Sequence, residues 1–76
     1  MPHVIFKLYS GKSERQKQAL AQAVTEAVTR TLNYGEDSVS VGIEDVEPKD
    51  WTEGVYKPDF IDKPGTIYRK PGYDPR

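Results

Sequence analysis

The chain has no cysteine and only one histidine, so two common ways of stabilising a small protein are missing. Without cysteine no disulfide can form, and one histidine cannot supply a histidine-rich metal site. With 76 residues, the chain is expected to fold as one domain, residues 1–76, that buries only about 60% of its unfolded surface. Domains this small usually need disulfides, a metal or oligomerisation. We therefore expect oligomerisation to complete the fold.

The sequence also lacks an excess of charge and a long hydrophobic run. Charged residues make up 30% of the chain, but the net charge is −1, which gives no basic surface for nucleic acid or for an acidic membrane. No hydrophobic run approaches the ~20 residues of a membrane span. The N-terminus does not have the pattern of a signal peptide. We expect a cytoplasmic protein with no nucleic-acid or membrane partner.

What the sequence does contain is a pattern of strand, helix and strand. In residues 3–9 every even-numbered residue is apolar, and in 38–46 residues 39, 41 and 43 are apolar. A period of two with β-branched and aromatic residues predicts strands with one buried face. Between them, apolar residues recur at helical spacing over 14–32, a length of about 28 Å. The sequence predicts an α+β fold with a β-α-β unit and two parallel strands.

The sequence marks both the start and the end of the predicted helix. Ser13 and Gln16 have the spacing of a capping box, in which each side chain bonds the other's backbone N–H. Asn33 and Gly35 supply a C-terminal stop.

The last third of the chain differs in kind. From about residue 48 to 76 it holds five of the six prolines, so we expect no long regular element there, only a short helical turn at 48–51 and other turns. It is also rich in aromatic residues, which a disordered tail would not be. We interpret it as an ordered C-terminal arm that packs over a partner subunit or over the site.

Pro2 has two readings. Proline is tolerated at the start of a strand, where its missing N–H need not pair. If Met1 is removed, however, Pro2 becomes a rigid secondary amine at the N-terminus. A free α-amino group titrates near 8, and an apolar pocket lowers that value. Such an amine is a suitable proton shuttle at physiological pH.

The order of these features resembles the 4-oxalocrotonate tautomerase family, and the longer C-terminal end resembles its dimeric branch. The resemblance rests on Pro2, the alternating strand, Gly11 to Ser13 opening the helix, Gln16 and Lys17, Glu26, Ala27, Arg30, Leu32, Ser38, Val39 and Trp51. It implies an isomerase with Pro2 as general base and acid, which interconverts the enol and keto forms of a 2-oxo acid without cofactor or metal. It also implies a homodimer.

The resemblance assigns three substrate-binding positions. Lys12 and Ser40 stand where shorter family members have arginines, so carboxylate and carbonyl binding are expected to be looser. Trp51 matches the aromatic wall of the pocket. Each also has a structural reading, as a solvated turn lysine, an outward strand serine and a core or interface tryptophan. Arg15 is a candidate for the missing second cation, and His3 for substrate contact, although both suit an exposed surface.

Two other functions share the same residues. One is a hydratase or dehalogenase in which protonated Pro2 activates water. The other is a non-catalytic oligomeric binding module, which the replacement of both arginines by Lys12 and Ser40 favours.

Overall fold

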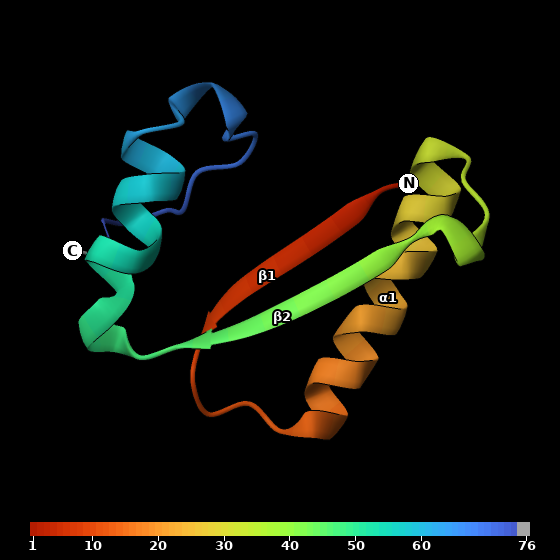
Figure 1. Cartoon of the computed structure of the whole chain (residues 1–76), viewed down its shortest axis with the longest axis horizontal. Helices are drawn as coiled ribbons and strands as arrows, with labels where there is room; N and C mark the ends of the chain where they lie inside the picture. The colour runs from red at the N-terminus through yellow and green to blue at the C-terminus, as the bar shows by residue number, and fades with distance from the viewer. Residues whose placement is uncertain (75–76) are drawn as a thin grey trace. The chain divides into compact units, whose positions relative to one another are not determined.

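The structure, a computed structural model, describes residues 1–74 and divides into two compact units, Met1–Asp45 and a second unit that begins at Val46. The first unit contains β1 (His3–Tyr9), α1 (Glu14–Leu32), the 3₁₀ turn η1 (Glu36–Ser38) and all but the last residue of β2 (Ser40–Val46). The strands are neighbours in one sheet and run in the same direction, with α1 on one face (Figure 1). The predicted β-α-β fold is confirmed.

The helix begins and ends where its capping residues predict. The Gln16 backbone N–H donates to Ser13 Oγ at 3.1 Å, and the Ser13 N–H donates to Gln16 Oε1 at 3.0 Å. At the other end Asn33 adopts the left-handed conformation (φ 62°) and its N–H donates to the Thr29 carbonyl. Free N–H groups at the start of α1 and free carbonyls at its end therefore find partners.

The alternation in β1 matches the predicted faces, whereas β2 begins two residues later than expected. In β1, Ile5 and Tyr9 are 52% and 43% exposed, while the even-numbered residues are half-buried. Ser38 belongs to η1 and not to a strand, because its backbone N–H and its hydroxyl both donate to the Gly35 carbonyl, at 3.1 and 2.8 Å. These bonds close a turn and delay the extended conformation until Ser40.

The second unit corrects the expectation that the proline-rich segment forms turns only. It has the expected short turn, η2 (Pro48–Asp50), but this leads into the ten-residue π-helix η3 (Thr52–Ile61), followed by η4 (Pro64–Thr66). Pro58 lies inside η3. Two local contacts support the helix despite the lost N–H: the rings of Tyr56 and Phe60 stack with centroids 5.3 Å apart, and Val55 is only 4% exposed.

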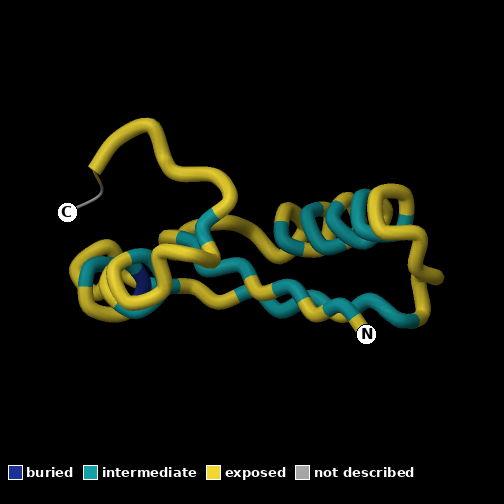
Figure 2. Tube along the Cα trace, turned by 90° about the horizontal axis from the view of Figure 1, so that it is seen from above, coloured by how far each residue is buried: buried dark blue, intermediate teal, exposed yellow. Residues whose placement is uncertain are grey.

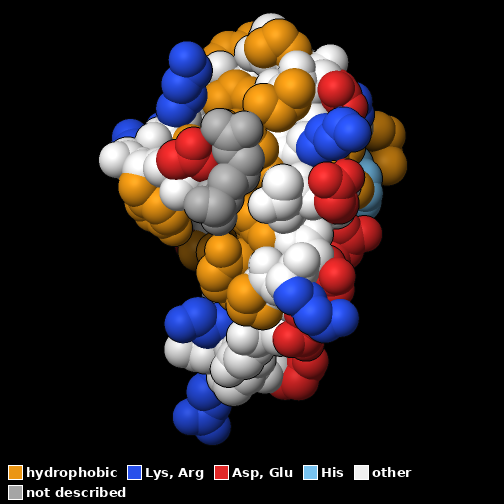
Figure 3. All heavy atoms as spheres, turned by 90° about the vertical axis from the view of Figure 1, so that its left-hand side faces the viewer, with side chains coloured by type: hydrophobic (Ala, Val, Ile, Leu, Met, Phe, Trp, Pro, Cys, Tyr) orange, Lys and Arg blue, Asp and Glu red, His pale blue; other side chains and the backbone are white. Residues whose placement is uncertain are grey.

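Burial is slight along the part of the chain described. Within residues 1–74, Val55 is the single buried hydrophobic residue, seen as the one dark-blue stretch of Figure 2. Hydrophobic side chains reach the surface among charged ones in Figure 3. Exposed examples are Leu32 at 57%, Tyr68 at 99% and Tyr73 at 72%. Over the same residues, no helix combines the length and the apolar character that crossing a bilayer requires.

Candidate active site

Pro2 is held by the edge at which both strands begin. It directly precedes β1, and its carbonyl oxygen accepts the backbone N–H of Ser40, the first residue of β2, at 3.1 Å. Because parallel strands start at the same edge of a sheet, the two predicted site residues lie next to each other. While Met1 is attached, the Pro2 nitrogen is an amide; its removal would leave a secondary amine fixed by the sheet.

His3 lies at the same edge and bonds the side chain of Ser40. Nδ1 of His3 is 2.6 Å from Oγ of Ser40. Ser40 is therefore held by two bonds, one from its backbone to Pro2 and one between its hydroxyl and His3, the first residue of β1. The structure thus brings together Pro2, Ser40 and His3.

Lys12 does not reach this group within one protomer. It follows the far end of β1, whose seven residues span about 23 Å at 3.3 Å per residue. There it lines a shallow hollow of about 210 Å³ with Leu8, Gln16, Lys17 and Leu20. Arg15 lies in the first turn of α1, which begins after the loop that follows β1. The last turn of α1, which lies near the start of β1 in Figure 1, contains the basic residue Arg30.

Trp51 belongs to the second unit, where it connects η2 and η3 and is half-buried. Its role as a wall beside Pro2 stays a prediction.

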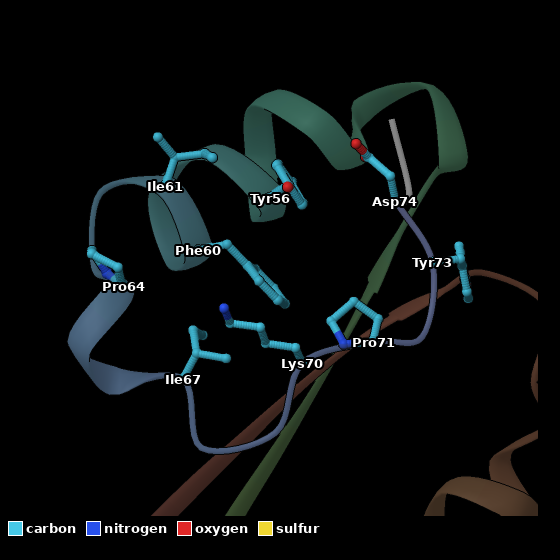
Figure 4. Close-up of a pocket in the computed structure, with 9 residues that line it drawn as sticks. All are labelled: Tyr56, Phe60, Ile61, Pro64, Ile67, Lys70, Pro71, Tyr73 and Asp74. Carbon is cyan, nitrogen blue, oxygen red and sulfur yellow. The ribbon is translucent and has the colours of Figure 1, made fainter.

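The same unit contains a larger hollow of about 400 Å³, lined mainly by aromatic and aliphatic side chains of η3 and the turns that follow (Figure 4). The charged residues at this hollow are Lys70 and Asp74, and the Lys70 side chain runs toward the side that Phe60 and Ile67 line. Pro2, His3 and Ser40 are not among the residues that line this hollow.

Lys17 has a role that the sequence reasoning missed. Its Nζ lies 2.5 Å from Oδ2 of Asp45 on β2 and 3.8 Å from Oε1 of Glu14. The hydrogen bond to Asp45 raises the pKa of Lys17; burial opposes the rise, and the charges of Asp45 and Glu14 add to it. Two features of the sequence indicate this ion pair. Lys17 is three residues from Leu20 on the apolar stripe of α1, and Asp45 continues the odd-numbered positions of β2.

Across residues 1–74, no three His, Cys, Asp or Glu side chains gather closely enough to hold a metal ion. The carriers of polar chemistry at the Pro2 edge are a strand-bound proline, a hydroxyl and an imidazole. Such a set can move a proton and donate a hydrogen bond.

Comparison with known proteins gives a consistent result. A family model described as "Tautomerase enzyme" matches residues 2–58. A probable tautomerase of Xylella fastidiosa is 37% identical over 73 residues, which cover 96% of this chain and 89% of that protein. Tautomerase PptA of Cronobacter sakazakii is 36% identical over 75 residues, covering 97% and 99%. The two relatives match nearly the whole chain, whereas the family model ends at residue 58, inside the second unit.

Solved structures agree with the fold over about two thirds of the chain. TomN, a 4-oxalocrotonate tautomerase homologue in the tomaymycin biosynthetic pathway, superposes with a TM-score of 0.64 at 32% identity, over 66% of this chain and 77% of TomN. YwhB, another homologue of 4-oxalocrotonate tautomerase, gives a TM-score of 0.60 at 36% identity, over 62% and 77%.

Proposed function

The chain belongs to the 4-oxalocrotonate tautomerase family and is an isomerase, and we propose that it interconverts the enol and keto forms of a 2-oxo acid, with Pro2 as the proton-transferring base after Met1 is removed. The observation that carries this proposal is the bond from the Ser40 N–H to the Pro2 carbonyl. This bond holds the backbone of Pro2 at the end of the sheet where both strands begin, and a base that must meet a substrate requires such a fixed position.

In the proposed reaction the amine of Pro2 takes the proton of the enol hydroxyl and returns it to the neighbouring carbon. Negative charge develops on the substrate oxygen between these steps. Ser40, whose backbone N–H bonds the Pro2 carbonyl, has a hydroxyl that we propose as the neutral donor for that oxygen. Stabilising such charge is usually the largest catalytic contribution, and a hydroxyl does less than an arginine. We therefore expect a modest turnover.

The substrate carboxylate needs a cation, and the strand length separates Lys12 from Pro2 within one chain. We propose that Lys12 serves the Pro2 site of a neighbouring protomer, and that Trp51 forms part of the apolar wall. The near absence of buried residues in 1–74 and the exposed Ile5 and Tyr9 on the sheet support an oligomer, which we propose to be a homodimer.

The test is the conversion of phenylenolpyruvate, followed by ultraviolet absorbance, for the unaltered protein and for Pro2→Ala. General acid–base catalysis contributes about 10²–10⁴-fold, so we expect a fall of at least about 100-fold in kcat. The matched control is Pro64→Ala, which changes a proline of the second unit in η4. Equal rates for Pro2→Ala and the unaltered protein would reject the proline mechanism and favour a non-catalytic binding module.

A further inference from the structure

The side chains of His3 and Ser40 form a unit whose chemistry goes beyond that of a serine alone. The backbone bond from Ser40 to Pro2, at 3.1 Å, fixes where Ser40 lies, while the 2.6 Å contact with His3 fixes its hydroxyl. Both side chains belong to exposed residues, so a ligand at this edge can reach them. His3 therefore governs the direction in which the Ser40 hydrogen points.

The proton inventory of this pair allows two arrangements. A hydroxyl has one hydrogen and two lone pairs, and a neutral imidazole has one N–H and one bare nitrogen. If Nδ1 of His3 is bare, the Ser40 hydroxyl donates to it and offers only lone pairs to a ligand. If Nδ1 carries a hydrogen, it donates to Oγ and the Ser40 hydrogen is free to point at the ligand. A substrate oxygen that gains negative charge is stabilised by the second arrangement alone.

We propose that His3 is a positioning residue that makes Ser40 a hydrogen-bond donor to the 2-oxygen of the substrate. The inference rests on the proposed function, in which Pro2 moves the proton. His3 donates through Nδ1 to Ser40 Oγ, and Ser40 donates to the substrate oxygen while that oxygen carries charge. Neither residue gains or loses a proton over the cycle, because the proton that leaves the enol oxygen travels through Pro2 to carbon. A serine in the place of an arginine thereby gains an oriented N–H behind it.

The test compares His3→Ala, Ser40→Ala and the double variant in the phenylenolpyruvate reaction. A hydrogen bond to a charged group contributes about 1.5–3 kcal/mol, so each single variant should lose about tenfold or more in kcat, with a smaller change in KM. Since His3 acts through Ser40, the double variant should be no slower than Ser40→Ala. His3→Asn places an amide N–H near the position of Nδ1 and should recover most of the loss.

The matched control is Ser38→Ala, which removes a hydroxyl bonded to the Gly35 carbonyl and not to His3. It should keep kcat within about twofold, because it leaves the donor pair intact. Circular dichroism and light scattering must show each variant folded and assembled like the unaltered protein.

Three results would overturn the role of His3: unchanged kcat in His3→Ala, additive losses in the double variant, or no recovery in His3→Asn. Failure of this inference is distinguishable from failure of the proposed function. If Pro2→Ala is inactive and His3→Ala is fully active, the function stands and the positioning role falls. If Pro2→Ala is as active as the unaltered protein, the proposed function falls and takes the inference with it.

Discussion

Lys17 on α1 and Asp45 on β2 form an ion pair, with Nζ 2.5 Å from Oδ2, that joins the helix to the sheet across 28 residues of sequence. The Lys17 side chain is 16% exposed and that of Asp45 41%. The hydrophobic residues of the first unit are at most half-buried, so its core contributes little to stability. An ion pair between helix and sheet therefore contributes a larger share of the stability of this unit.

This ion pair predicts a loss of stability at high pH. The pKa of Lys17 is raised by Asp45, so the charged form is favoured by folding. The stabilisation is complete below the unfolded pKa of about 10.4 and disappears as pH rises through the higher folded pKa. The urea concentration at the unfolding midpoint should therefore decrease when the pH is raised from 9 to a value above the folded-state pKa of Lys17. Lys17→Met should weaken this pH dependence. Lys49→Met, which removes an exposed pair with Asp50 at 3.8 Å, is the control and should leave the dependence unchanged.

The capping box predicts a stability cost for Ser13→Ala. The substitution removes the acceptor of the Gln16 N–H and should lower the free energy of unfolding by about 1 kcal/mol. Ser13→Asp keeps an acceptor oxygen and adds a negative charge at the helix N-terminus, so it should restore that loss. Chemical denaturation of the three proteins measures the difference. An unchanged free energy of unfolding in Ser13→Ala would show that the bond from the Gln16 N–H to the Ser13 hydroxyl does not stabilise α1.

The sequence predicted the first unit well because local signals decide it. The capping box at Ser13 and the left-handed Asn33 set both helix ends. The same kind of signal failed to predict η3, because the prolines of this segment disfavour a helix. Contacts such as the Tyr56–Phe60 stacking stabilise the helix despite Pro58. β2 begins at Ser40 and not at Ser38 because hydrogen bonds from Ser38 to Gly35 close a turn there. The alternating pattern did not predict these bonds.

The candidate site was predictable only in part. Pro2 and Ser40 meet because two parallel strands begin at one edge, which the β-α-β pattern implies. Lys12 sits beyond the opposite end of β1, so its place in a site depends on how a second protomer docks. The pattern of a single chain carries no information on that arrangement. The bond between His3 and Ser40 could have been expected from the same strand register, since each residue begins its strand.

The proposed chemistry requires an unblocked amine at Pro2. Intact mass measurement of the purified protein should show that Met1 is absent. A variant with one alanine inserted between Met1 and Pro2 converts the proline nitrogen into an amide, which cannot accept a proton near neutral pH. It should lose about 100-fold or more in kcat while folding normally. A protein that retains Met1 and remains active would contradict the role of Pro2.

The separation of Lys12 from Pro2 predicts that each site is shared between protomers. Light scattering should give at least twice the mass of one chain. Pro2→Ala and Lys12→Ala should each be nearly inactive alone. When the two variant proteins are mixed, unfolded and refolded together, the mixture should regain activity. In a mixed dimer, one site combines the intact Pro2 of one chain with the intact Lys12 of the other. For random pairing about half of the dimers are mixed and one of their two sites is intact, so about a quarter of the sites should work.

Pro2→Ala refolded with Pro2→Ala,Lys12→Ala is the control and should stay inactive, because no chain in it supplies Pro2. A mixture of the two single variants that stays inactive would show that Lys12 serves its own chain or no site at all.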